Sequence, residues 1–211
     1  HSPKDAMACG IAMIQQHFSL VPTHTATENI ILGNSRGLLN LKACNEKIEA
    51  LARKYGFDIP VDLPVGKLAV GVQQKVEILK ALVRGAKILI LDEPTAGLDP
   101  AGCEQILRNI CDYRTQTGST VIIVSHSMDD VARLADRLVV FNHGGIRFDG
   151  TPEEVFSQPE ELRSIGLAVP AATELAMELK KLGLKLPNSI YTNEQLEKAL
   201  VALKRLSLIH I

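Results

Sequence analysis

Two adjacent carboxylates follow a short apolar run in the segment Ile88–Pro100, which reads ILILDEPTAGLDP. The run Ile88–Leu91 is typical of a buried parallel strand, and Pro94 prevents that strand from continuing. Asp92 and Glu93 are therefore expected at the carboxyl end of a strand, where open α/β sheets bind ligands. Phosphoryl transfer needs one acid for Mg²⁺ and another group to orient the attacking water, so the pair predicts a nucleotide hydrolase. The alternative is a strand end without chemistry, because short motif matches are often accidental.

The elements that must position these acids alternate between strand and helix. Strands are expected over 87–91, 120–124 and 137–142, with helices over 101–117 and 127–135 between them. This alternation predicts a parallel sheet. A turn at 143–145 leads to a hairpin partner over 146–148, and Thr151 with Pro152 and Glu154 starts a short helix.

The regions on either side of this alternation are predicted to be helical. Helices are expected over 27–32, 41–55 and 72–83, and again over 171–182 and 192–206. In the third of these, Val72, Val76, Leu79 and Val83 form an apolar stripe that faces a core. We divide the chain into parts at 1–24, 25–85, 86–165 and 166–211.

Composition excludes several classes of function. The 211 residues include 23 basic and 24 acidic side chains, and the net charge of −1 argues against nucleic acid as a partner. The longest apolar runs are far shorter than the roughly 18–20 residues that cross a bilayer. The four cysteines lack C-x-x-C spacing, so we expect free thiols packed as small hydrophobic residues rather than zinc ligands or disulfides.

Several motifs occur in a fixed order, and together they resemble the ATP-binding subunit of ABC transporters. The resemblance extends from about Ser2 to Arg205. The motifs are the glutamine segment Met13–Phe18 with Gln16, the signature Leu68–Lys75, the acidic strand Ile88–Glu93, the D-loop Gly97–Pro100 and the switch pair Ser125-His126. The fold implied is α/β: a P-loop NTPase core of ABC type lacking its Walker A region, a helical subdomain and a C-terminal helical appendage.

The resemblance implies ATP and Mg²⁺ as cofactors. Asp92 would hold Mg²⁺, Glu93 would polarise the attacking water, and His126 would contact the γ-phosphate. Gln16 would reach the metal and the water. Taken singly, a histidine after a strand is more often structural and a loop glutamine is ordinary; the motif order favours the catalytic roles.

The resemblance also implies two protein partners. The signature residues Leu68, Ala69, Val70, Gly71 and Val72 would serve the nucleotide held by a second ATPase subunit, in a head-to-tail dimer, and Asp99 would contact that partner. The first turn of a helix favours a phosphate anion. Residues 25–85 would dock on a transmembrane subunit, which places the protein peripherally at the cytoplasmic face of the membrane.

The sequence departs from the family pattern in two motifs. The phosphate-binding pattern G-x-x-x-x-G-K-[ST] is absent, and its nearest match, 61–68, lacks the first glycine and the final hydroxyl. We expect an N-terminally truncated chain that begins at His1 rather than Met and neither binds ATP tightly nor hydrolyses it. Ala69 stands where the family usually has a serine that meets the γ-phosphate.

The two halves of the chain resemble different branches of the family. Residues up to the acidic strand resemble ATPases of nucleoside and simple-sugar importers, and the remainder resembles energy-coupling-factor ATPases. A chimera joined near 91–102 and a natural branch that mixes both patterns remain open. Residues 207–211 resemble translated sequencing adapter and have no expected place after the last helix. A rival function is a non-enzymatic module that engages an intact ATPase, and the transported substrate is not encoded here.

Overall fold

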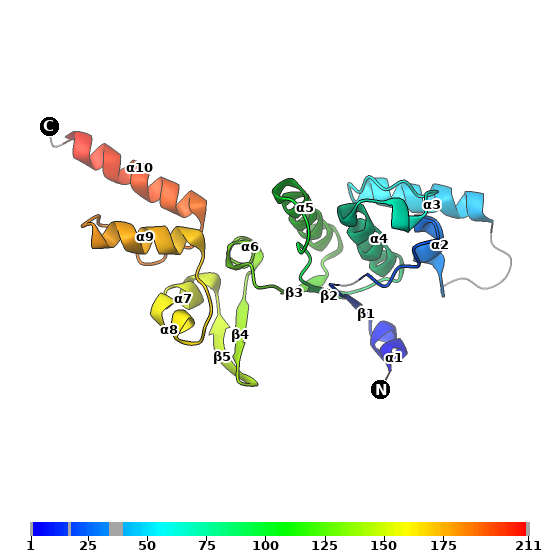
Figure 1. Ribbon diagram of the computed structural model, residues 1–211, viewed down its shortest axis with the longest axis horizontal. Helices are drawn as coiled ribbons and strands as arrows, with labels where there is room; N and C mark the ends of the chain where they lie inside the picture. Colours follow the sequence, from blue (N-terminus) through cyan, green and yellow to red (C-terminus); the bar gives the residue numbers. More distant parts are fainter. Residues whose placement is uncertain (1, 17, 34–39, 210–211) are drawn as a thin grey trace. The chain divides into compact units, whose positions relative to one another are not determined.

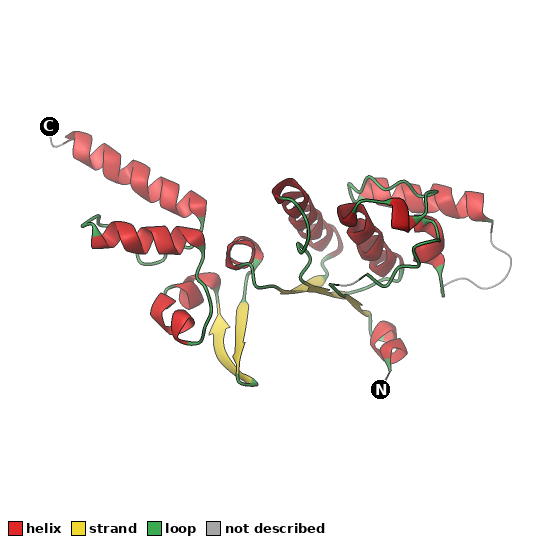
Figure 2. Cartoon of the chain, viewed as in Figure 1, coloured by secondary structure: helices red, strands yellow, loops and turns green. Residues whose placement is uncertain are grey.

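The apolar runs of the first half form a three-stranded parallel sheet (Figures 1 and 2). The computed structural model describes residues 2–16, 18–33 and 40–209, which fall into two compact units, His1–Ser125 and His126–Ile211. In the first unit the strand order is β1 (Ile11–Ile14), β2 (Ile88–Asp92) and β3 (Thr120–Val124). The predicted parallel sheet is confirmed, with β2 as its central strand.

The two faces of this sheet differ in burial. On one face Leu89 and Leu91 are fully buried, and α4 (Val70–Val83) contacts β1 while α5 (Pro100–Thr117) contacts β3. Side chains at paired positions of a parallel sheet share a face. On the other face Met13, Ile122 and Val124 are 55%, 46% and 52% exposed. Among the described residues of the first unit, α4 and α5 therefore cover the face that holds Leu89 and Leu91, and the face with Met13, Ile122 and Val124 is more exposed.

Further helices of the first unit accompany α4 and α5. These are α1 (Pro3–Ala8), α2 (Ala26–Ile31), α3 (Leu41–Lys54) and a 3₁₀ turn at Val65–Lys67. The predicted stripe on α4 is confirmed, since Val76 and Leu79 are fully buried. Helix α2 begins with a capping box, in which Glu28 accepts from the Thr25 amide at 2.8 Å and Thr25 Oγ1 accepts from the Glu28 amide at 3.2 Å. It packs on α3 and α4.

Helix α5 has clear signals at both ends. Asp99 is its N-cap, Pro100 stands at its first position, and Gly118 closes it with a left-handed backbone at φ 64°. Near the end of the helix the buried Tyr113 hydroxyl donates to the carbonyl of Ala86 at 2.9 Å. This bond ties α5 to the chain two residues before β2.

The second unit consists of a hairpin and a set of helices. The elements are α6 (Met128–Leu134), β4 (Leu138–Asn142), β5 (Gly145–Gly150), α7 (Pro152–Phe156), α8 (Pro159–Ser164), α9 (Ala171–Lys181) and α10 (Asn193–Ile209). The predicted hairpin is confirmed, because β4 and β5 pair antiparallel. Phe148, Phe156 and Leu162 lie in one buried cluster of this unit, and Ala176 and Leu196 lie in another.

Some predicted boundaries are wrong. The last helix was expected to end at Leu206, but α10 continues to Ile209 because residues 207–209 contain no glycine or proline to stop it. His17 and the last two residues of the predicted tail, 210 and 211, lie outside the described residues. All four cysteines are free thiols, yet Cys9 is exposed rather than packed, since it follows the short α1 at the surface. None of the described helices combines the length and apolar character needed to cross a bilayer.

Candidate active site

Asp92 and Glu93 lie at the carboxyl edge of the parallel sheet. Asp92 is the last residue of β2 and pairs with Val124 at the end of β3. The backbone amide of Glu93 donates to the carbonyl of Val124 at 2.9 Å, so the pairing extends one residue beyond the strand. Because β2 has a neighbour on each side, the acid pair occupies the middle of this edge.

The backbone of Glu93 is held in an uncommon conformation. Its φ is 49°, in the left-handed region that non-glycine residues rarely adopt. Its carbonyl accepts from the amide of Ala96 at 3.1 Å, and its Oε2 accepts from Ser125 Oγ at 3.4 Å. Bonds from the following turn and from the end of β3 therefore hold the backbone of Glu93, and Ser125 contacts its carboxylate.

Gln16 reaches the same edge from the neighbouring strand. It follows β1 by two residues, and the last residue of β1, Ile14, pairs with Leu91 of β2. Gln16 and Asp92 therefore extend from adjacent strands. Gln16 also borders a pocket of about 370 Å³ that is lined further by Phe18, Leu20, Pro22, Val65, Gly66 and Gln73.

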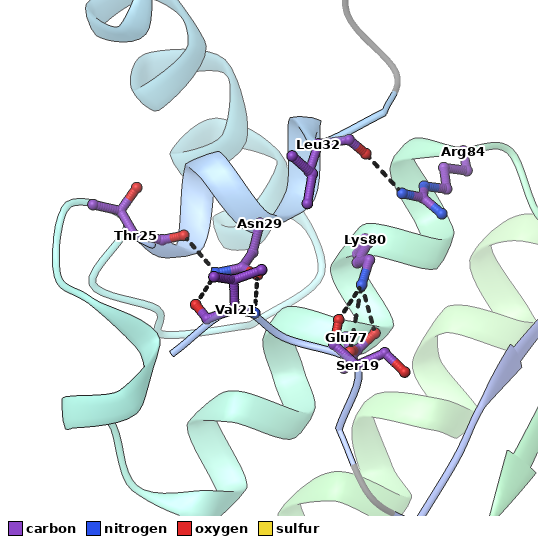
Figure 3. A network of polar contacts seen from close by, with 8 residues as sticks. All are labelled: Ser19, Val21, Thr25, Asn29, Leu32, Glu77, Lys80 and Arg84. Atoms are coloured by element: carbon purple, nitrogen blue, oxygen red, sulfur yellow. Dashed lines mark hydrogen bonds and ion pairs between the residues drawn. The ribbon is translucent and has the colours of Figure 1, made fainter. Parts of the chain in front are cut away.

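The segment after Gln16 is hydrogen-bonded to α2 through the buried side-chain amide of Asn29 (Figure 3). Asn29 is 1% exposed, and its Nδ2 donates to the carbonyls of Val21 at 3.1 Å and Thr25 at 3.0 Å. Its Oδ1 accepts from the amide of Val21 at 2.8 Å. A single side chain thus satisfies both backbone groups of Val21 and fixes the path of the chain between β1 and α2.

The same segment is fastened to α4 by Lys80 (Figure 3). Lys80 Nζ donates to the carbonyl of Ser19 at 3.0 Å and pairs with Glu77 at 3.4 Å, with both charged side chains largely buried. Farther along α4, Arg84 donates to the carbonyl of Leu32 at 2.9 Å. The chain that follows Gln16 is therefore joined directly to the signature helix.

The predicted signature loop leads into α4 as expected. Ala69 is the N-cap of this helix and makes no side-chain capping bond, while its carbonyl accepts from the amides of Val72 at 2.9 Å and Gln73 at 3.0 Å. Leu68, just before it, accepts from Gln73 Nε2 at 2.8 Å. The amides of Val70 and Gly71 come before Val72, whose amide donates to the Ala69 carbonyl, so the helix start offers donors suited to an anion.

Asp99 has a structural contact within the first unit. Its Oδ1 accepts from the amide of Gly102 at 2.8 Å and caps α5. A Cβ at Gly102 would lie 2.7 Å from that oxygen, so glycine leaves room for the cap. Asp99 is exposed. Its predicted contact with a partner subunit stays a prediction.

His126 is the first residue of the second unit and is exposed. Its neighbour Ser125 contacts Glu93 within the first unit. Gln16, Asp92 and Glu93 are brought to one edge by the first unit. The convergence of His126 with Glu93 on one phosphate stays a prediction.

Metal binding at this edge would depend on ligands beyond its own acids. Within residues 2–16, 18–33 and 40–209, no three His, Cys, Asp or Glu side chains are grouped to hold a metal ion. Asp92 supplies one carboxylate, and Mg²⁺ often takes one or two carboxylates with water and phosphate oxygens completing its shell. The carboxylate of Asp92 therefore fits a Mg²⁺ whose remaining ligands are water and phosphate oxygens.

The sequence of this chain matches a known protein family and its members. Residues 3–96 match the profile described as ABC transporter. The chain is 44% identical over 172 residues to the energy-coupling factor transporter ATP-binding protein EcfA2 of Caldanaerobacter subterraneus subsp. tengcongensis, with 81% of this chain and 60% of that protein covered. Residues 3–96 are thus identified as an ABC transporter domain.

Other relatives span both branches of the family that the two halves resemble. The nucleoside import ATP-binding protein NupA of Lactococcus lactis subsp. cremoris is 44% identical over 146 residues, which cover 68% of this chain and 29% of NupA. The structure of cbiO1 from Clostridium perfringens, part of the ABC transporter complex cbiONQ, matches with a TM-score of 0.62 at 28% identity, covering 86% of this chain and 70% of that one. This chain thus spans less than two thirds of the curated relatives NupA and EcfA2.

The ABC-type P-loop NTPase fold is confirmed by these structural neighbours. A dimeric ATP-binding cassette in a post-hydrolysis state with ADP and Pi, MJ0796, matches with a TM-score of 0.60 at 22% identity over 72% of this chain and 68% of that one, which supports the fold alone.

The near-match to a phosphate loop at 61–68 lies around the 3₁₀ turn Val65–Lys67, not between a strand and a helix. Two side chains that contact the turn after β2, Ser125 and Gln74, had no predicted role there, because their contacts are tertiary.

Proposed function

We propose that this chain is the acid-bearing and partner-recognising part of an ABC importer ATPase that binds ATP with Mg²⁺ and hydrolyses it. The observation that carries the proposal is the placement of Asp92 and Glu93 in the middle of the carboxyl edge, with Gln16 on the adjacent strand. Open α/β sheets bind their ligands at this edge. Two acids with an amide beside them suit in-line attack of water on a terminal phosphate.

The side chains take distinct roles in this proposal. Asp92 holds Mg²⁺, directly or through water, and a bound Mg²⁺ would offset charge on the phosphates. Glu93 accepts a hydrogen bond from the attacking water and is kept in place by Ser125. Gln16 orients the water and the metal shell, and His126 contacts the γ-phosphate.

The proposal includes two protein partners, a second ATPase subunit and a transmembrane subunit, and exposed surfaces of the chain suit contact with them. Ala69, at the start of α4, and Asp99, at the start of α5, are both exposed, which suits contact with a second ATPase subunit in a head-to-tail dimer. The pocket bordered by Phe18, Pro22 and Val65 offers an apolar recess on the helical region. We assign this recess to a transmembrane subunit, which would hold the protein at the cytoplasmic face of the membrane.

The missing phosphate loop limits the ATP binding and the ATPase activity expected of this chain alone. Its backbone amides, lysine and hydroxyl are the main ligands of the β- and γ-phosphates and the metal, so 211 residues without them are expected to bind ATP weakly and to be inactive. Parallel sheets are normally covered on both faces, and the exposed side chains of Met13, Ile122 and Val124 suit coverage by a further segment of the full-length protein. The absent loop also supports a second candidate, a non-enzymatic module that engages an intact ATPase.

Calorimetry with Mg²⁺ and ATP tests the first part of the proposal. The 211-residue chain should show no micromolar binding, and a micromolar dissociation constant would contradict its dependence on the missing loop. In the full-length protein Glu93→Gln should lower kcat at least a hundredfold, as loss of a general base does. Glu153→Gln, an exposed glutamate on α7, is the matched control and should leave kcat unchanged. If the full-length protein neither binds nor hydrolyses ATP, the non-enzymatic module is favoured instead.

A further inference from the structure

One buried amide of α4 is bonded to the turn that carries Glu93. Gln74 is 4% exposed, and its Nε2 donates to the carbonyl of Pro94, twenty residues along the chain. Proline has no backbone N–H, so this carbonyl is the only backbone hydrogen-bonding group that Pro94 has. Pro94 is itself buried. A buried carbonyl needs a partner, and Gln74 supplies it.

This bond completes the support of the turn from its second side. From the side of β3, the carbonyl of Val124 accepts from the Glu93 amide, and Ser125 Oγ donates to the Glu93 carboxylate. From the side of α4, Gln74 holds the next peptide. The left-handed backbone of Glu93, at φ 49°, therefore lies between two fixed points on different elements.

The first turn of α4 also approaches the segment that follows Glu93. A Cβ placed on Gly71 would lie 3.4 Å from Leu98 Cδ2, which is close van der Waals contact. Leu98 belongs to the predicted D-loop and lies four residues after Pro94. The signature end of α4 is therefore tied to 94–98 by packing at Gly71 and by the hydrogen bond from Gln74.

We infer that Gln74 is a positioning residue that links the signature helix to the carboxylate of Glu93 within one subunit. The inference rests on the proposed function, in which Glu93 acts on the subunit's own nucleotide and Ala69–Val72 contact the nucleotide of the partner. A shift of α4 on contact with the partner's phosphate then reaches Glu93 through the Pro94 carbonyl. Gln74 couples the two nucleotide sites of the dimer.

Amide hydrogen exchange on the 211-residue chain, followed by NMR, tests the link without any nucleotide. Gln74→Met removes the donor at nearly constant length and should speed exchange at the amides of Glu93 and Ala96 at least fivefold, the effect of losing one hydrogen bond. Gln73→Met is the matched control, because Gln73 donates to Leu68 rather than to the turn. The control should leave both amides at their original rates.

Equal exchange at the amides of Glu93 and Ala96 in Gln74→Met and in the original chain would overturn the link. An equal acceleration of that exchange in Gln74→Met and in the control Gln73→Met would overturn it as well. Should Gln74→Met fail to fold, Gln74→Leu, which also removes the donor, replaces it under the same criteria. In the full-length ATPase Gln74→Met should lower kcat about tenfold with KM for ATP unchanged, whereas a general loss of folded protein would leave kcat per active site unaltered. An inactive full-length protein would count against the proposed function and leave the exchange result to judge the link.

Discussion

Replacing Ala69 by serine should stabilise α4 and strengthen the predicted contact with a partner's phosphate. Ala69 is the N-cap, with φ −58° and ψ 150°, a backbone that serine adopts readily, and it makes no side-chain cap. A serine Oγ there can accept from the amide of Val72 and thereby contribute about 1 kcal/mol of stability. Urea unfolding followed by circular dichroism measures this gain as a higher midpoint at an unchanged slope.

The same hydroxyl can act on the ligand as well as on the helix. Hydroxyl groups accept and donate at once, so the serine introduced in Ala69→Ser can accept from the helix amide while donating to a phosphate oxygen. A hydrogen bond to a charged group contributes about 1.5–3 kcal/mol, which corresponds to roughly 10- to 150-fold in affinity. In the full-length ATPase we therefore expect Ala69→Ser to raise turnover at subsaturating ATP, measured by phosphate release.

Ala50→Ser is the control for this prediction. Ala50 is exposed in the middle of α3, where the same chemical change offers no cap and should cost about 0.5 kcal/mol of helix propensity. The two substitutions should therefore have opposite signs. Stability of Ala69→Ser at or below the original chain would refute the capping argument, and unchanged turnover would refute the phosphate contact.

Three further predictions concern bonds that position the site. Asp99→Ala removes the cap of α5 and should cost about 1 kcal/mol in urea unfolding. Tyr113→Phe leaves the Ala86 carbonyl without its buried donor and should cost about 1–3 kcal/mol in the same assay. The Thr25 amide donates to Glu28 and lowers the pKa of that carboxyl, so its contribution to stability is present above the ordinary value near 4.5 and is lost as pH falls through the lowered pKa. Glu28→Gln should accordingly flatten the acid limb of a stability profile measured from about pH 7 to 3, and an unchanged limb would contradict this.

The parts of the fold that the sequence predicted best have strong local signals. The apolar runs of β2 and β3 and the Gly118 end of α5 were placed to within one residue. The four-residue β1 was not predicted, because a run of that length has no periodicity to distinguish it and becomes a strand only by pairing with β2. Helix α8 was missed although Pro159 opens it, since six residues carry little helical pattern.

The candidate site divides in the same way between local and tertiary information. Asp92 and Glu93 could be placed at a sheet edge because strand length and Pro94 are local signals. The left-handed backbone of Glu93 and the bond from Gln74 could not be predicted, since they depend on α4 packing against the turn from twenty residues away. A buried glutamine in a helix indicates that some polar partner exists, yet the sequence does not identify it.

Ala69 and Gln74 therefore act on different properties of α4. Ala69 lacks a hydroxyl at the start of the helix, where the proposed contact with a phosphate lies, while Gln74 and the fully buried Val76 and Leu79 anchor the helix farther along. Loss of the hydroxyl should weaken ligand contact without moving the helix, because the anchors lie about one to three turns farther along. Turnover lowered by Ala69 should then be recovered by serine alone, whereas turnover lowered at Gln74 should not be recovered by any change at position 69.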